Sequence, residues 1–248
     1  PTRERIQRAV KSILARQLPD GGFNIYARGP ADVSATVKAY FALKLAGVPT
    51  DDPRMVAARE RILSLGGIQA CNSYVKINLS LFGLYPREHC PSIPPEMILL
   101  PHKFIYRMSS WTRAIVVPLA IVHAANPARP VPAGFTLQEL FKPGGSFSYR
   151  RDERLFSWRT LFFTADRLLK FWERHHIRAV RKKAIRECEK WMLERTKYSD
   201  GLGAIYPPMM YVIMALDVLG YPPQHPERVE ALKQFWNLLT DDGERFFF

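Results

Sequence analysis

Residues 42–53 read ALKLAGVPTDDP, and residues 215–226 read ALDVLGYPPQHP. The two stretches align without gaps: alanine and leucine, a charged residue, an aliphatic residue, one glycine, and two prolines four residues apart. Gly47 and Gly220 stand where the C-terminal cap of a helix favours a positive φ, and the prolines that follow would stop the helix from continuing. The pattern predicts two copies of one helical unit.

Each copy is preceded by a second matching pattern, in which a helix leads into an Asp-Gly turn. Residues 13–23, ILARQLPDGGF, resemble residues 192–203, MLERTKYSDGLG, and a third, partial copy runs over residues 235–243. Apolar residues recur at helical spacing before the first turn and again through residues 37–45. Repeated units of this kind, with few strand signals, predict stacked helical hairpins, and periodicity alone favours any helical-repeat solenoid.

The segments between the repeats are less regular. Residues 86–101 and 126–145 are rich in proline and are predicted to be loops. Residues 104–125 have the composition of a helix, which Pro118 should bend or break.

Composition narrows the classes of function. The 248 residues are 47% apolar, as in folded proteins, and no stretch reaches the roughly 18 to 20 apolar residues of a membrane span. Cys71, Cys90 and Cys188 are scattered, which argues against a disulfide framework and against structural zinc, and suits a reducing compartment. The net charge is +13, and residues 142–197 hold 16 basic residues against 7 acidic ones. The excess indicates an anionic partner: nucleic acid, a membrane surface or a substrate.

Several common catalytic motifs are absent from the sequence. There is no glycine-rich phosphate loop, dinucleotide fingerprint, H-E-x-x-H or G-x-S-x-G. His175 and His176 are adjacent and would point to different faces of a helix, so we interpret them as surface residues. The first residue, Pro1, begins directly in a helical pattern and the last residues are an aromatic run, so we expect the sequence to be part of a longer protein.

The Asp-Gly units carry a resemblance to triterpene cyclases. Residues 17–23, QLPDGGF, are similar to the glutamine-to-tryptophan repeat of that family, with Phe23 in place of tryptophan. Further segments resemble squalene–hopene cyclases in order and spacing over nearly the whole chain: residues 29–44 (GPADVSATVKAYFALK), 94–96 (PPE), 105–106 (IY), 110–114 (SWTRA) and 200–208 (DGLGAIYPP).

This resemblance implies an all-α fold, an α/α toroid of helical-hairpin repeats of the terpenoid cyclase type. Residues 1–248 would form part of that toroid, as an incomplete barrel. It also implies an isomerase with no metal or organic cofactor, which protonates squalene and moves the cation along the folded chain to give hopene or hopanol. The D-x-D-D motif that supplies the proton in the family occurs nowhere in these residues, so the isolated chain is expected to be inactive.

Six residues match substrate-contact positions of the family. The resemblance assigns the substrate cavity to Trp111, Ile205, Tyr206 and Pro207, and the channel constriction to Met108 and Val116. Aromatic faces suit such a cavity because they stabilise a cation without removing a proton from it. Packing in a protein core is the alternative for each residue. Tyr206 stands where some members carry glutamine, and Thr196 and Leu202 replace the glutamine and tryptophan of the second repeat.

Residues 161–183 join a large apolar stripe to a basic flank. At helical spacing, this segment predicts a membrane-interface helix whose contacts would be Leu161, Phe162, Leu168, Leu169, Phe171 and Trp172. The basic flank follows with Arg174, Arg178, Arg181, Lys182 and Lys183. The family's membrane-contact region falls here, although a stripe that faces the core is the alternative. The expectation is a peripheral, monotopic protein on the cytoplasmic side of the membrane.

The expected partners are squalene or a related polyprenoid and the membrane surface, and a homodimer would fit as well. Nucleic acid is not expected, because its case rests on charge alone and the aromatic residues share the apolar stripe. Two other readings stay open: a truncated, non-catalytic helical-repeat protein that binds lipid or protein, and part of an oxidosqualene cyclase.

Overall fold

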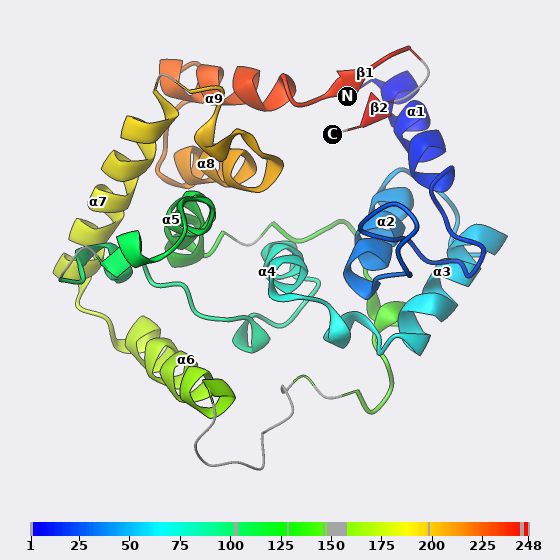
Figure 1. Ribbon diagram of the computed structural model, residues 1–248, viewed down its shortest axis with the longest axis horizontal. Coiled ribbons are helices and arrows are strands. Elements are labelled where there is room, and N and C mark those ends of the chain that lie inside the picture. The colour runs from blue at the N-terminus through cyan, green and yellow to red at the C-terminus, as the bar shows by residue number, and fades with distance from the viewer. Residues whose placement is uncertain are drawn as a thin grey trace. The chain divides into compact units, whose positions relative to one another are not determined.

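The computed structural model describes residues 2–101, 104–127, 129–145, 147, 158–197, 199–243 and 246–247. The predicted all-α class is confirmed (Figure 1). The α-helices are α1 (Arg3–Leu14), α2 (Val33–Leu45), α3 (Pro53–Ser64), α4 (Ser73–Leu81), α5 (Ser110–Ala125), α6 (Trp158–His175), α7 (Arg178–Thr196), α8 (Tyr206–Val218) and α9 (Pro226–Trp236). Short 3-10 helices are η1 (Ile68–Ala70), η2 (Arg87–His89), η3 (Pro95–Leu99), η4 (Phe104–Arg107), η5 (Gln138–Leu140) and η6 (Leu202–Ala204).

The chain folds as two compact units. Unit 1 comprises the described residues of 1–91, 128–151 and 240–247, and unit 2 those of 92–127 and 152–239. Unit 1 also contains a two-residue antiparallel pairing of β1 (Thr240–Asp241) with β2 (Phe246–Phe247), which lies against α1.

The first predicted repeat forms α1, α2 and the start of α3 in unit 1. Asp32 caps α2 by accepting a hydrogen bond from the Ala35 amide at 2.8 Å. Gly47 then ends the helix with φ +87°, and the Val48 amide donates to the Leu43 carbonyl at 3.0 Å. This is the glycine-capped helix end that the sequence predicted, and α3 begins at Pro53.

The second repeat forms α7, α8 and α9 of unit 2 in the same way. Gly220 has φ +85°, and the Tyr221 amide donates to the Leu216 carbonyl at 3.0 Å. Gly21 and Gly201 hold matching places in the two Asp-Gly turns, with φ +81° and +103°. The two copies of the repeat therefore share the backbone conformation of their turns as well as their sequence pattern.

One side-chain amide in each unit joins the Asp-Gly turn to the third helix of the repeat. In unit 1, Gln17 Nε2 donates to the carbonyls of Gly21 (2.9 Å) and Arg54 (2.8 Å), the latter in α3. In unit 2, Thr196 occupies the position of Gln17, and Gln234 of α9 donates instead to the Ser199 carbonyl at 3.0 Å. The connection is kept although its donor has moved to another helix.

The cores of the two units are largely apolar. In unit 1, α2 and α3 bury Leu43, Met55 and Ile62. One charged network also lies inside it: Lys44 Nζ contacts Glu139 Oε1 at 2.6 Å, and the Tyr40 hydroxyl donates to the same oxygen at 3.1 Å. This network holds the loop around η5 to α2, because both partners of Glu139 are buried α2 residues.

The predicted helix over residues 104–125 was wrong at its N-terminal end. Met108 and Ser109 separate η4 from α5, because the Ser109 hydroxyl caps a new helix by accepting from the Thr112 amide at 3.1 Å. Pro118 is buried inside α5 and does not end it. The helix continues to Ala125, and Asn126 caps it in the left-handed conformation. The segments predicted as proline-rich loops also contain the short helices η2, η3 and η5.

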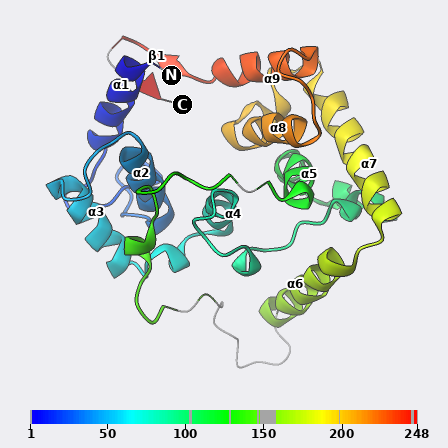
Figure 2. The same cartoon turned by 180° about the vertical axis from the view of Figure 1, so that it is seen from behind.

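The segment 161–183 is divided between two helices that meet at a corner (Figures 1 and 2). The break falls at His176 and Ile177. Arg181, predicted in the basic flank, is instead buried, and its Nε donates to Glu96 Oε1 of η3 at 2.6 Å. Among the described helices, none is both long and apolar enough to cross a membrane.

Candidate functional site

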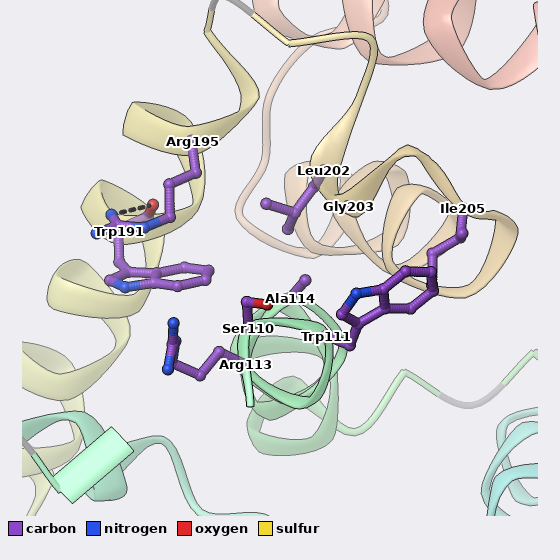
Figure 3. A pocket seen from close by; sticks show the side chains of 9 residues that line it. All are labelled: Ser110, Trp111, Arg113, Ala114, Trp191, Arg195, Leu202, Gly203 and Ile205. Carbon is purple, nitrogen blue, oxygen red and sulfur yellow. Dashed lines mark hydrogen bonds between the residues drawn. The ribbon is translucent and has the colours of Figure 1, made fainter. Parts of the chain in front are cut away.

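A pocket of about 240 Å³ lies in unit 2 between the start of α5, the end of α7 and the turn around η6 (Figure 3). It is lined by Ser110, Trp111, Arg113, Ala114, Trp191, Arg195, Leu202, Gly203 and Ile205. The Asp-Gly turn of the second repeat therefore forms one wall, and the SWTRA segment forms another.

Local backbone geometry brings these walls together. Gly203 has φ +71° and the next residue, Ala204, has φ +49°, so the chain turns sharply into α8. A Cβ atom on Gly203 would lie 3.4 Å from the Ala114 Cβ, which means that η6 packs close to α5. Small residues at both positions permit this approach, and the Ser109 cap fixes where α5 begins.

The structure brings together two of the six predicted substrate-contact residues. Trp111 and Ile205 line the same pocket, and Figure 3 shows the indole of Trp111 directed toward Ile205. Trp111 is 61% exposed, so its ring is available to a bound molecule and is not a core residue.

The other four predicted residues border this region without lining the pocket. Tyr206 begins α8, and its ring centroid lies 5.4 Å from that of Phe235 on α9. Pro207 follows in the first turn of α8 and is half-buried. Met108 precedes α5, and Val116 lies further along that helix, and both are half-buried.

Sequence reasoning missed the aromatic and cationic side of the pocket. The Arg195 guanidinium carbon lies 4.3 Å from the ring centroid of Trp191, and Arg195 Nη2 donates to the Tyr106 hydroxyl at 3.0 Å. Arg113 lies 5.0 Å from the Tyr106 ring centroid, and its Nη1 donates to the Tyr106 and Met108 carbonyls. The available signal was the i, i+4 spacing of Trp191 and Arg195 within the second repeat.

The pocket offers indole faces and an apolar wall. Two arginines also line the pocket: both donate to backbone carbonyls, and Arg195 lies over the Trp191 ring. The exposed ring of Trp111 is therefore the π face available to a ligand. The pocket lining, as far as the structure describes it, contains no carboxylate and no histidine. Its described groups can therefore position and enclose a ligand and stabilise positive charge through π faces, but they do not include a group suited to donate a proton.

A second notable surface is the outer face of α6. Leu161, Phe162, Leu168 and Phe171 are 56%, 68%, 65% and 64% exposed. Leu169 and Trp172, predicted to share this face, are half-buried. Between residues 160 and 175, no side chain is fully buried. The predicted stripe is thus largely exposed in the described part of the chain. Leu161, Leu168 and Phe171 share one side of the helix, and we call these three residues the α6 apolar face. Phe162 lies about two and a half turns before Phe171 and so points to the opposite side.

Comparison with known proteins places the chain beside triterpene-forming enzymes. Residues 1–244 match the family described as the squalene-hopene cyclase N-terminal domain. The squalene–hopene cyclase of Zymomonas mobilis is 39% identical over 226 residues, which cover 90% of this chain and 34% of the relative. The squalene–hopene cyclase of Alicyclobacillus acidocaldarius is 33% identical over 232 residues, covering 92% of this chain and 36% of the relative.

A third relative has a different name. Dammaradiene synthase of Dryopteris crassirhizoma is 33% identical over 229 residues, covering 91% of this chain and 33% of that protein. The chain spans about a third of the length of the curated relatives it matches.

Proposed function

Because the chain belongs to the squalene–hopene cyclase family, we propose that it contributes one part of a triterpene cyclase, an isomerase that converts squalene to hopene or hopanol. Family membership accords with the all-α, helical-hairpin class predicted from the sequence. Within this proposal, residues 1–248 supply part of the helical framework of an α/α toroid. The observation that carries the proposal is the meeting of Trp111 and Ile205 in one pocket, on a framework matched by the family over residues 1–244.

The role proposed for this part is to shape the cavity and stabilise the cation. The exposed indole of Trp111 offers a π face to positive charge that develops on the polyprenoid, and Ile205 limits the space beside it. Tyr206, Pro207, Met108 and Val116 extend the proposed cavity wall and channel. The D-x-D-D motif is absent from the 248 residues, so in this proposal the proton comes from residues outside them.

Reconstitution tests this role. The chain is co-expressed with the remaining two-thirds of the Zymomonas mobilis relative and assayed with squalene. We expect hopene only when both parts are present, because general acid catalysis requires the acid. Trp111→Ala should lower the rate about tenfold, the value of one cation–π contact, while Trp111→Phe should keep most of it.

Trp236→Ala is the matched control, because Trp236 is also an exposed tryptophan of unit 2 but lies on α9, away from the pocket lining. Hopene formed by the chain alone would contradict the division of roles. Equal losses for Trp111→Ala and Trp236→Ala, with unchanged folding by circular dichroism, would contradict the assignment of Trp111.

The α6 apolar face is proposed as a membrane-docking surface, which would make the protein monotopic and place it at the cytoplasmic side of the bilayer. Exposed aromatic and leucine side chains on one face of a helix suit insertion about 5 to 10 Å into the interface. Docking would bring the cavity to a water-insoluble substrate. Flotation with vesicles tests it: Leu168→Asp/Phe171→Asp should abolish binding to phosphatidylcholine vesicles, whereas Ile25→Asp/Tyr26→Asp, at exposed sites in unit 1, should not.

A further inference from the structure

The two acidic residues of α6 face the rest of unit 2. They are Asp166 and Glu173. Asp166 Oδ1 accepts a hydrogen bond from the Ser92 amide at 2.9 Å, and its Oδ2 lies 2.6 Å from Lys170 Nζ. Glu173 Oε1 lies 3.1 Å from Nδ1 of His123, a buried residue of α5. These negative charges are therefore used to hold the helix in place.

The basic residues beside the α6 apolar face are arranged in the opposite way. Arg167 and Arg174 lie four residues before and three residues after Phe171, so helix geometry puts all three on one edge of the helix. Both arginines are exposed, and neither has an ion-pair or hydrogen-bond partner among the residues that the structure describes. The outward edge of α6 thus combines apolar surface with uncompensated positive charge.

The corner between α6 and α7 continues this character. Ile177 is 58% exposed, and Arg178 and Lys182 follow as exposed residues in the first two turns of α7. Positive charges at a helix N-terminus oppose the helix dipole, and like charges four residues apart repel each other. Helix stability therefore does not account for them, which is the kind of local conflict expected at a functional surface.

We propose that this surface, defined as the α6 apolar face together with Arg167, Arg174 and Arg178, selects bilayers that contain anionic phospholipid. The inference rests on the membrane docking proposed above and adds the class of lipid. The apolar side chains would enter the interface while the arginines contact phosphate and carboxylate groups of the headgroups. Each basic residue near an anionic surface is worth about fivefold in partition, so the three arginines together give roughly 150-fold, of which Arg167 and Arg174 account for roughly 30-fold.

The test compares flotation on phosphatidylcholine vesicles with and without 30 mol% (about one in three) phosphatidylglycerol, at low and at physiological salt. We expect roughly 150-fold tighter binding to the anionic vesicles at low salt, declining with salt because exposed charges are screened. Arg167→Gln/Arg174→Gln should remove most of that preference and leave binding to neutral vesicles unchanged. Arg186→Gln/Lys190→Gln, which removes the same charge from exposed sites further along α7, should keep it.

The outcomes separate the two proposals. Equal binding to neutral and anionic vesicles overturns the lipid selectivity and leaves membrane docking standing. An equal loss in both double variants also overturns it, because net charge and not this surface would then be responsible. Tighter binding to duplex or single-stranded DNA than to anionic vesicles, or self-association through α6 that excludes vesicles, overturns it as well. Failure to bind any vesicle overturns membrane docking itself. Circular dichroism of each variant checks that it is folded.

Discussion

Arg181→Met should destabilise unit 2 strongly, although the residue replaced is a charged one in a basic segment. Arg181 Nε and Glu96 Oε1 are 2.6 Å apart, and both side chains are 11% exposed. Removing the guanidinium would leave the Glu96 carboxylate buried without a partner. Loss of one member of such a pair costs roughly 3–5 kcal/mol.

The pair itself should contribute much less than that cost. Arg181 Nη2 and Glu96 Oε2 are buried with no hydrogen-bond partner among the described residues, so the desolvation of both ions is only partly compensated. Replacing both ions by apolar residues of similar volume is often neutral or stabilising. We therefore expect the free energy of unfolding of Arg181→Met/Glu96→Met to differ from that of the unaltered chain by no more than about 1–2 kcal/mol.

Urea denaturation followed by tryptophan fluorescence measures this directly, because all five tryptophans belong to unit 2. With a slope of about 2 kcal/mol/M, Arg181→Met should lower the midpoint by about 1.5–2.5 M, and the double variant should recover most of the difference. Arg186→Met, at an exposed site of the same helix, should change stability by no more than about 0.5 kcal/mol. Additive losses in the double variant would refute the reasoning.

Three further predictions concern unit 1 and the cysteines. Gly21→Ala should lower the stability measured by thermal unfolding by about 2–5 kcal/mol, because φ is +81° and a Cβ would lie 2.6 Å from the backbone of α3. Gly47→Ala, with φ +87° and open space around it, should cost only the backbone strain. Equal losses in the two variants would show that the contact with α3 is irrelevant. Burial is the largest single influence on Glu139 and would raise its pKa, but the hydrogen bonds from Lys44, the backbone and Tyr40, together with the Lys44 charge, jointly outweigh it and the pKa is lowered. Its stabilisation is therefore present above the unfolded pKa of about 4.3 and is lost as pH falls through the folded pKa; Glu139→Gln should flatten the loss of stability on acidification, and an unchanged slope would contradict this. Burial raises the pKa of the Cys188 thiol to about 12, so thiol-specific reagents at pH 8 should modify it only after unfolding, and fast modification of the native chain would contradict its burial.

The repeat architecture could be predicted because its signals are local. A glycine with positive φ followed by proline stops a helix whatever surrounds it, and Gly47 and Gly220 do so in both units. The start of α5 was missed because it depends on one capping hydroxyl, Ser109, within a segment whose composition is helical on both sides of it.

Contacts between residues far apart in the sequence could not be predicted, and they determine the state of Arg181 and part of the pocket. Arg181 looks like any basic surface residue until Glu96, 85 residues earlier, is found beside it. Trp111 and Ile205 were predicted through a family resemblance, while Trp191 and Arg195 were missed because their role depends on Tyr106 of η4. Periodicity identified the apolar stripe of α6 but could not decide between core and surface, and only the exposure of Leu168 and Phe171 decides it.

The moved amide that joins each Asp-Gly turn to its third helix has a consequence for exchanging repeats between the two units. In unit 1 the donor belongs to the turn, through Gln17, and in unit 2 it belongs to the helix, through Gln234. A chimera that places α9 beside the first turn would bring two amides to one junction, and one that places α3 beside the second turn would bring none. A chimera should therefore keep the stability of this junction only when the turn and its third helix are exchanged together, as one segment longer than either sequence motif.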